Sequence, residues 1–312
     1  MPRFLYGWGE LLICVELSVV VPTLNAREEL GDCLDALSTH VPGAEVIVVN
    51  GPSADGTTGM IQKRDDVDVL VELADRTINV ARNAGIERAT GSTVALVNHT
   101  LAVSSEWADT VREGIERADV VTGPTRNQID GTDTSQETRQ IAGRDVSYFN
   151  AGNVAFRREP LDALDGFDEY LAVGGARDLA HRLAANDYEV LWEDRMAVTQ
   201  ELTTDGGEKE PDWGWKYRSL AYRLVKNYGL RPTVIRRLLS HASKDAFTEF
   251  RDVIRGDGRP SGWLGTGRDV IVNMCGGIKN GLGARRRDRT ARRNPRGRTV
   301  RADRAVTVYD WR

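Results

Sequence analysis

An aspartate and a histidine lie one helical turn apart in residues 176–186, a segment whose pattern predicts a helix. Asp178 and His181 could form a pair that accepts a proton near neutral pH, which is the task of a general base. A structural interpretation is also open, because Asp178 precedes Arg182 by four residues and the two could form an ion pair. Asp178 and His181 are therefore the candidate catalytic residues.

A second group of residues combines aromatic faces with positive charge. Trp213, Trp215 and Arg218 lie within six residues of one another. Aromatic faces can stack on sugar rings, and an arginine can bind a phosphate. The two tryptophans could instead anchor the following helix to the core. These three residues are therefore candidates for binding a ligand that combines a sugar ring with a phosphate.

Strand-like and helical segments alternate from residue 17 to about 122, and they must position these side chains. Strand-like runs cover Leu17–Val21, Glu45–Val49, Val67–Glu72, Thr93–Val97 and Asp119–Val121. Helical patterns lie between them, at about 26–39, 57–64, 77–89 and 105–117. This alternation predicts an α/β fold with a mostly parallel, Rossmann-like sheet that carries helices on both faces. Ligands bind such sheets beyond the carboxyl ends of the strands, here the loops 22–25, 50–57 and 98–100.

The remainder of the chain is predicted to be irregular at first and then helical. Residues 123–147 are polar and predict a long loop, and Tyr148–Phe156 predicts a single strand. Helical patterns follow from about Trp213 to Tyr228 and from Arg231 to Ile254. Apolar residues at helical spacing in 268–282 predict an amphipathic helix that lies either on a membrane or on the protein's own core.

Charge is distributed unevenly along the chain. The net charge is −4, whereas residues 285–312 contain eleven Arg and three Asp. This excess of arginine favours contact of residues 268–304 with an anionic membrane surface, rather than with nucleic acid. A disordered, solvated tail is the alternative. We expect an N-terminal extension (1–16), an α/β domain (17–205), a helical region (206–284) and a basic, disordered tail (285–312).

Two absences bear on location. No stretch of the sequence is long and apolar enough to predict a span of the bilayer. The three cysteines, Cys14, Cys33 and Cys275, show no metal-ligand spacing, which favours a reduced, cytosolic protein. We therefore expect a cytoplasmic protein that is peripheral on the inner face of the cell membrane.

Five segments, in order, resemble the family-2 glycosyltransferases of GT-A fold, of the kind that acts in archaeal and bacterial lipid-linked glycan assembly. They are Val20–Asn25, Val48–Thr57, Ala81–Gly85 with Ala89–Gly91, Phe149–Arg158, and Gly166–Glu169 with Asp178-Leu179. Each segment is weak alone, but the ordered set spans roughly residues 17–192. The resemblance therefore implies that the predicted α/β domain binds a nucleotide-sugar.

The resemblance implies that the first loops hold a nucleotide-sugar donor. The implied donor-binding residues are Pro22, Thr23, Asn25, Asn50, Asp55, Arg82, Asn83, Asn98, His99 and Thr100. Thr23, Asn25 and Asp55 could hydrogen-bond the base and ribose, and Arg82 could bind the diphosphate. Structural interpretations are open as well: Asn25 could cap a helix, Asp55 could form a turn, and Arg82 could pair with a surface carboxylate.

The chain departs from the family's pattern at two places. Asn98-His99-Thr100 stands where the family places aspartates that hold a divalent metal, so the cofactor is left open between Mg²⁺, Mn²⁺ and none. Gly175 and Ala176 stand where the family has a Glu-Asp pair, whose aspartate is the general base. Only Asp178 remains of that motif, and Asp168 and Glu169 are further candidates for the base.

The resemblance implies an inverting transfer of a hexose or hexuronic acid from a nucleoside-diphosphate sugar to a polyprenyl or dolichyl phosphate-linked glycan. It also implies that Trp213, Trp215 and Arg218 lie on the acceptor side. Such an enzyme would offset the phosphate charge with Arg82, His99 and Arg177 and would use a displaced carboxylate as base. The alternative is a non-catalytic binding or scaffolding subunit that resembles a glycosyltransferase.

Overall fold

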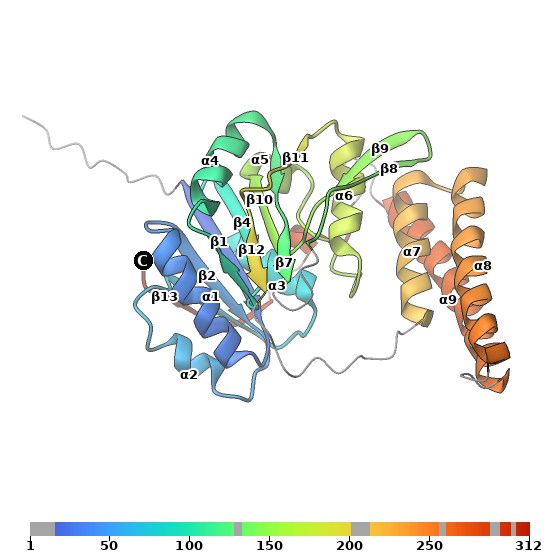
Figure 1. Ribbon diagram of the computed structural model, residues 1–312, viewed down its shortest axis with the longest axis horizontal. Helices are drawn as coiled ribbons and strands as arrows, with labels where there is room; N and C mark the ends of the chain where they lie inside the picture. The colour runs from blue at the N-terminus through green and yellow to red at the C-terminus, as the bar shows by residue number, and fades with distance from the viewer. Residues whose placement is uncertain (1–15, 128–132, 201–212, 256–259, 288–293, 301–303) are drawn as a thin grey trace, which may run out of the picture.

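A mixed sheet of eight strands forms the centre of the computed structural model, which describes residues 16–127, 133–200, 213–255, 260–287, 294–300 and 304–312. The strand order is β11-β6-β10-β4-β1-β2-β3-β13 (Figure 1). Their bounds are β1 Leu17–Thr23, β2 Glu45–Asn50, β3 Val69–Leu73, β4 Thr93–Val97, β6 Val120–Thr122, β10 Asn153–Arg157, β11 Val190–Trp192 and β13 Ala305–Asp310. Only β10 and β13 run antiparallel to their neighbours in this sheet. The predicted α/β, mostly parallel fold is confirmed.

Helices cover both faces of this sheet because its central strands are apolar on both sides. All seven residues of β1 are buried. Val19 and Val21 point to the face covered by α1 and α4, whereas Val20 points to the face covered by α3, α5 and α6. The bounds of the helices around the sheet are α1 Arg27–His40, α2 Thr57–Ile61, α3 Ile78–Arg88, α4 Trp107–Arg117, α5 Arg158–Ala163 and α6 Gly175–Ala185.

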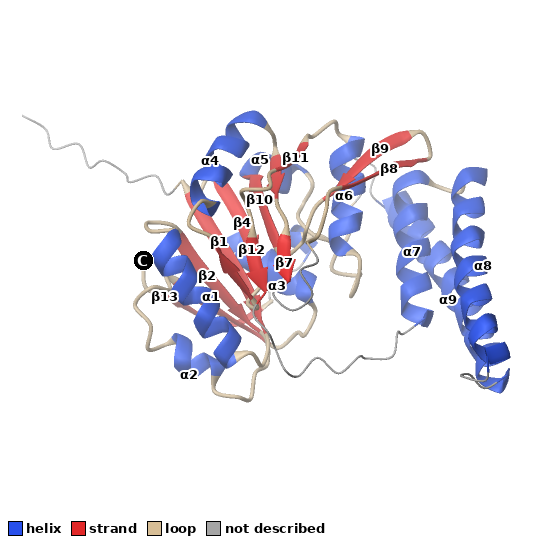
Figure 2. Ribbon diagram, in the orientation of Figure 1, coloured by secondary structure: helices blue, strands red, loops and turns tan. Residues whose placement is uncertain are grey.

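Three long helices stand together beside the sheet (Figure 2). They are α7 Trp213–Tyr228, α8 Pro232–Arg255 and α9 Pro260–Arg287. Helices α7 and α9 pack closely, because Gly277 and Gly281 carry no side chain where the helices meet. A Cβ at Gly277 would overlap the carbonyl oxygen of Arg218, and one at Gly281 would lie 2.7 Å from that of Tyr222. Glycines that weaken α9 as an isolated helix thus permit its packing.

Helix α9 contains the predicted amphipathic segment 268–282. Met274, Ile278 and Leu282 pack against the protein's own core, whereas Ile271 and Val272 are exposed. The core-facing interpretation is therefore confirmed for the first three residues. No helix in the described ranges is long and apolar enough to cross a membrane. The predicted membrane-binding stretch 268–304 also includes 288–293 and 301–303, which lie outside the described residues, as do residues 1–15 of the expected N-terminal extension.

The prediction of a long loop over residues 123–147 is wrong in large part. It contains β7 (Thr125–Asn127), β8 (Glu137–Ile141) and most of β9 (Arg144–Tyr148), and β8 and β9 form a hairpin. Strand β7 joins β5 (Leu101–Val103) and β12 (Val198–Gln200) in a small sheet. The expected strand 148–156 is two strands, since the chain turns between β9 and β10. The polar hairpin escaped notice because three of the five β8 side chains are exposed, which removes the apolar signal.

The expectation of a disordered tail is wrong for residues 304–312. Strand β13 pairs with β3 at the edge of the sheet. Arg312 binds Glu45 at 2.6 Å, and Arg304 binds Glu169 at 2.6 Å and also Glu87. These two arginines therefore pair with carboxylates of the acidic body. Part of the positive charge of the tail is thus neutralised within the chain.

Candidate functional site

The loops after β1 and β2 form one hydrogen-bonded unit at the carboxyl edge of the sheet. Asn25 Oδ1 accepts a hydrogen bond from the Ala54 amide at 2.8 Å, and the Ser53 hydroxyl accepts one from the Asn25 amide at 2.9 Å. Ser53 in turn donates to Asn50 Oδ1 at 2.6 Å. Asn25 and Asn50, both predicted donor-binding residues, therefore lie in a single preformed rim.

Asn25 does not cap α1, which was one interpretation of the sequence. Its backbone is left-handed, with φ of 50°, and the helix begins at Arg27. Asp55 fills that role from the other loop, because its Oδ2 accepts the Arg27 amide at 3.1 Å while Oδ1 accepts the Thr57 hydroxyl at 2.6 Å. Burial raises the pKa of Asp55, but these hydrogen bonds outweigh it and the net pKa is lowered. Asp55 therefore fastens the two loops together as a carboxylate.

The residues after β4 complete the rim. His99 Nδ1 lies 3.0 Å from the carbonyl oxygen of Pro22, and the Asn98 amide donates to the Gly152 carbonyl at 3.0 Å. Because a carbonyl only accepts, His99 carries a proton on Nδ1, and burial lowers the pKa of its ring. Neutral His99 thus offers a lone pair at Nε2 instead of the positive charge expected for it. Thr100 follows, half-buried, with its amide 3.4 Å from Asn98 Oδ1.

This rim does not fit a hard divalent cation. The turn after β4 offers an amide, an imidazole already engaged at Nδ1 and a hydroxyl, whereas Mg²⁺ prefers several carboxylate oxygens. In the described residues, no group of three His, Cys, Asp or Glu side chains comes together. The described rim therefore lacks the set of ligands that a magnesium ion requires.

Arg82 supplies positive charge at the rim, one turn into α3. Its Nη2 donates to the Ala151 carbonyl at 3.1 Å, and its guanidinium lies over the Phe167 ring, 5.2 Å from the centroid. Burial lowers its pKa to about 10, so it is still charged at neutral pH. The described residues give Arg82 no carboxylate partner, and its buried Nε has no hydrogen-bond partner. The predicted surface ion pair is therefore not formed, and the cation is available to a ligand.

The neighbouring Asn83 and the earlier Thr23 have opposite surroundings. Asn83 is fully buried, where it donates to the Phe167 carbonyl at 2.9 Å and accepts the Phe167 amide at 2.8 Å. It thus holds the 167–169 turn and is not turned to the rim. The Thr23 hydroxyl, in contrast, is buried beneath the rim without a hydrogen-bond partner. Of these two predicted donor-binding residues, only Thr23 has a side-chain polar atom without a hydrogen-bond partner in the described residues.

A cavity of about 470 Å³, called here the rim cavity, opens beside Arg82. Its wall includes Asn150-Ala151 and residues 172–177, so it lies where the family's Glu-Asp pair would stand. A Cβ at Gly175 would overlap the side-chain amide of Asn79, which is fixed by its bond to the Leu171 carbonyl. The position therefore excludes a glutamate, which explains one of the two missing carboxylates.

Glu137 places a carboxylate in the wall of the rim cavity that sequence reasoning missed. It belongs to β8 and binds Arg177 at 2.7 Å and also Arg139. The hydrogen bond from Arg177 lowers its pKa, so Glu137 is ionised at neutral pH. The missed signal was the Ala142-Gly143 turn between β8 and β9, where both residues have positive φ, a geometry typical of tight hairpins.

The predicted Asp178–His181 pair is not formed, because each of the two side chains binds other partners. Asp178 is fully buried and binds Arg182 at 2.9 Å and Lys226 at 2.8 Å. Burial would raise its pKa, but these cations outweigh it and hold the pKa well below the usual value. The alternative interpretation, an ion pair with Arg182, is confirmed. A carboxylate so enclosed is a weak base with no exposed oxygen, so Asp178 acts as a structural residue.

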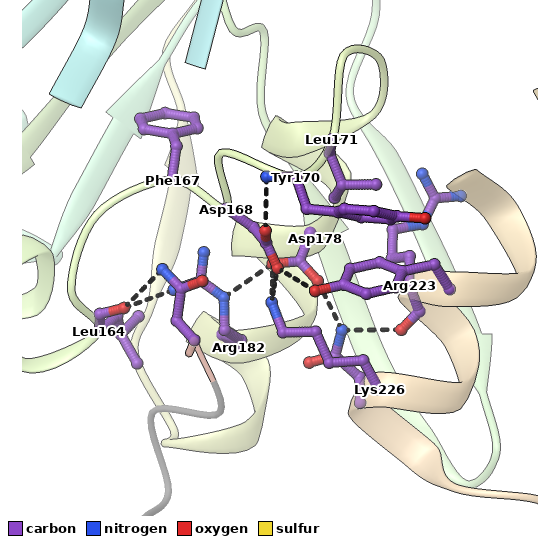
Figure 3. Close-up of polar contacts among 12 residues, drawn as sticks. Leu164, Phe167, Asp168, Tyr170, Leu171, Asp178, Arg182, Arg223 and Lys226 are labelled. Atoms are coloured by element: carbon purple, nitrogen blue, oxygen red, sulfur yellow. Dashed lines mark hydrogen bonds and ion pairs between the residues drawn. The ribbon is translucent and has the colours of Figure 1, made fainter. Parts of the chain in front are cut away.

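Asp168 joins the same network. It is fully buried, binds Lys226 at 2.6 Å and accepts the Tyr222 hydroxyl at 2.8 Å. We call Asp168, Asp178, Arg182 and Lys226 the buried ion cluster. It connects the 165–171 turn, α6 and α7, as Figure 3 shows, and so fixes α7 against the α/β part of the chain.

His181 faces a different environment from its expected partner. Its Nδ1 lies 2.9 Å from the Tyr228 hydroxyl. Burial and the charge of Arg223 lower its pKa to about 3, so it is neutral at physiological pH. A neutral histidine can accept a proton, but Nε2 is buried without a partner and Asp178 does not orient the ring.

The predicted acceptor residues line neither the rim cavity nor the neighbouring cavity described below. Trp215 lies 6.1 Å from the Tyr170 ring, and Arg218 donates to the Tyr170 hydroxyl at 2.9 Å. Trp213 lies beneath the ammonium of Lys216, at 4.3 Å. The alternative interpretation, in which these aromatics anchor α7, agrees with these contacts.

Comparisons with known proteins follow this geometry. Residues 18–167 match the model of glycosyl transferase family 2. Glycosyltransferase AglE of Haloferax volcanii is 25% identical over 178 residues, which are 51% of this chain and 58% of that protein. The structure of S. aureus TarS 1–349 with UDP-GlcNAc superposes with a TM-score of 0.61 at 17% identity, over 83% of this chain and 81% of that one. The mannosyltransferase PcManGT of Pyrobaculum calidifontis, with GDP-Man and Mn²⁺, gives 0.56 at 16% identity, over 88% of each chain.

The chain matches only part of the length of its curated relatives. The matched stretches cover 58% of AglE and 17% to 34% of three further curated relatives. The two structural likenesses cover most of both chains and establish the GT-A fold. Residues 18–167, from β1 to the turn before α6, are thus similar to glycosyltransferase family 2, and most of the chain shares the GT-A fold.

Proposed function

We propose that the protein transfers a sugar from a nucleoside-diphosphate sugar to an acceptor hydroxyl with inversion at the anomeric carbon. The observation that carries this proposal is the rim itself. Hydrogen bonds run from the Asn25–Asp55 loops through Pro22 and His99 to Gly152, next to Ala151, which receives a bond from Arg82. The solved structures that share this fold hold UDP-GlcNAc and GDP-Man.

In this proposal the donor lies along the rim with its sugar in the rim cavity. The loop amides and the hydroxyl of Thr23 bind the base and ribose. Arg82 binds the diphosphate, because it is the rim cation without a carboxylate partner in the described residues. A charge-assisted hydrogen bond of this kind favours the departing nucleoside diphosphate, whose charge grows as the bond to the sugar breaks.

Glu137 is the carboxylate best placed to act as base. The acceptor hydroxyl attacks the anomeric carbon, its proton passes to Glu137, and the bond between that carbon and the diphosphate oxygen breaks. Glu137 is ionised and lines the rim cavity, whereas Asp168 and Asp178 are enclosed by cations. Arg177, at 2.7 Å, orients the carboxylate.

The finer parts of the proposal concern substrate and place. We propose a hexose or hexuronic acid as the sugar and a polyprenyl or dolichyl phosphate-linked glycan as the acceptor. The protein would work in the cytoplasm at the inner face of the membrane. The exposed Ile271 and Val272 on α9 support a peripheral contact there.

Calorimetry with nucleoside diphosphates and their sugars tests the proposal. We expect binding by the full chain and a loss of about 10- to 100-fold in affinity for Arg82→Gln. Arg88→Gln, on the same helix but away from the rim, is the matched control and should bind normally. Absence of binding to any uridine or guanosine diphosphate would refute the proposal.

The second candidate function is a non-catalytic binding or scaffolding subunit. The glycine and alanine at positions 175 and 176 favour it, since the family's usual base is absent. A screen for donor hydrolysis and sugar transfer separates the two functions. Turnover that Glu137→Gln abolishes excludes the scaffold, whereas donor binding without turnover supports it.

A further inference from the structure

A second cavity, of about 320 Å³, adjoins the rim cavity and is called here the basic cavity. It lies between the β8–β9 hairpin, the start of α6, α7 and α8. Both cavities share Glu137, Tyr148, Val173, Gly174 and Arg177 as lining residues. A molecule that extends from the basic cavity can therefore present a group beside Glu137.

The basic cavity has far more positive than negative charge. Its charged lining residues are Arg139, Arg177, Lys216, Arg223, Arg237 and one carboxylate, Glu137. Glu137 pairs with two of these arginines, and Asp245 pairs with Lys216 at 2.7 Å. The described residues give neither Arg223 nor Arg237 a carboxylate partner.

Three polar atoms in its wall are buried without hydrogen-bond partners. They are His181 Nε2, Ser219 Oγ and Arg223 Nε. His181 and Ser219 are 1% and 3% exposed, so water from the surface does not readily satisfy them. Buried donors are almost always paired in proteins, and three orphans in one wall indicate a missing partner. Because neutral His181 can accept the Tyr228 hydroxyl at Nδ1, its Nε2 can carry the proton and donate to an anion.

Gly174 brings this donor set close to the rim cavity. It has φ of 78°, and a Cβ there would lie 2.6 Å from Arg223 Nη1. Glycine at this position therefore lets the guanidinium approach the boundary between the cavities.

We propose that the basic cavity binds the phosphate or pyrophosphate group of the acceptor. Several guanidinium and hydroxyl donors around a small anion match the geometry of phosphoryl oxygens. The acceptor hydroxyl would then reach the rim cavity, with its phosphate held by Arg223, Arg237 and His181. This assignment rests on the proposed transfer reaction, and the anion can come from a lipid-linked glycan or a soluble sugar phosphate.

Inorganic pyrophosphate is the probe for the test, added to the full chain in the presence of the best-binding nucleoside diphosphate. If no nucleotide binds, the proposed function fails, and pyrophosphate is then titrated alone as a separate measurement. We expect binding that Arg237→Gln weakens about tenfold or more, with Ser219→Ala weakening it less. Arg236→Gln removes the same charge from an exposed neighbour on α8 and should leave affinity unchanged.

Histidine NMR resonances give an independent readout, because the chain has four histidines. Pyrophosphate should shift the signals of His181 and His241, which line the basic cavity, and not that of His40. No binding, or binding that Arg236→Gln weakens as much as Arg237→Gln, would overturn the proposal. So would binding that shifts neither His181 nor His241.

A final comparison identifies the source of the anion. Vesicles with and without a polyprenyl pyrophosphate are compared with a soluble sugar 1-phosphate. Preference for the charged vesicles that Arg237→Gln removes assigns a lipid-linked acceptor. Equal dependence of the soluble compound on Arg237 assigns a soluble sugar phosphate, and both results support the anion site. Arg237-independent binding of both ligands contradicts it.

Discussion

Helix α7 contributes to two charged regions, the buried ion cluster and the basic cavity, whose charges are balanced differently. Lys226 and the Tyr222 hydroxyl enter the buried ion cluster, where Asp168 and Asp178 satisfy the cations around them. Arg223, the next residue after Tyr222, lines the basic cavity with a buried Nε that has no partner. Both regions contain buried polar atoms, yet only the buried ion cluster is balanced by acids. Charge that is fully paired indicates a structural role, and charge that is not indicates a ligand.

Loss of Lys226 should unbalance the charges of the buried ion cluster. Lys226→Met removes the cation between two buried carboxylates, so Asp168 loses its cation and Asp178 keeps only Arg182. We expect a loss of about 3–5 kcal/mol in the free energy of unfolding, measured by urea denaturation. Arg112→Gln, which breaks an exposed pair with Asp109, should cost about 0–1 kcal/mol. A small loss for Lys226→Met would show that the cluster is not structural.

On the cavity side, a substitution should change chemistry and leave stability intact. Glu137→Gln keeps the shape of the side chain but removes its capacity to take a proton. We expect turnover to fall about 100-fold or more, while affinity for the donor is unchanged. Asp145→Asn, on the other strand of the same hairpin, should retain full activity. A loss of donor affinity alone would assign Glu137 to binding instead of proton transfer.

The stability of the buried ion cluster should depend on pH. The pKa of Asp178 is lowered in the folded state, so the stability it contributes is present above its unfolded pKa of about 4 and is lost as pH falls below that. We expect the free energy of unfolding to fall by about 2–3 kcal/mol between pH 5 and pH 2 through this carboxyl group. Urea denaturation at a series of pH values measures the fall. The same series with Lys226→Met should be flatter, and an equal slope would contradict the assignment.

The C-terminal strand offers the smallest effect. Arg312 pairs with the buried Glu45. Burial raises the pKa of Glu45, but hydrogen bonds, among them those from Ser18 and Thr90, outweigh burial, and the net pKa is lowered. Because those bonds persist in Arg312→Gln, we expect a loss of only about 0.5–1 kcal/mol in the free energy of unfolding. A much larger loss would mean that β13 depends on this one pair.

Local patterns were sufficient to predict the α/β half of the molecule. Strands β1, β2 and β4 lie within two residues of their predicted bounds, because buried parallel strands are continuous apolar runs. The proximity of Asn25 and Asp55 could also be predicted, since they lie in the loops that follow two neighbouring parallel strands. The left-handed backbone of Asn25 could not be inferred, because the amide of Arg27 at the start of α1 is capped by Asp55, which is 28 residues away.

The candidate site was harder to predict because its parts meet over long distances. Lys226 binds Asp178 across 48 residues, and no local pattern shows that a carboxylate will be enclosed in this way. Glu137 lies in a polar hairpin whose apolar residues are few. The tail was also misjudged, since an arginine-rich segment looks the same in sequence whether it meets solvent or its own acidic body.

Gly277 and Gly281 have a consequence for how acceptor choice could diversify. They set the spacing of α9 against the rear of α7, while Ser219 and Arg223 project from the front of α7 into the basic cavity. A single methyl group at either glycine would push α7 forward and narrow that cavity from behind. Substitutions in α9 could thus change the size of acceptor that fits the basic cavity, although α9 contributes no side chain to its described wall.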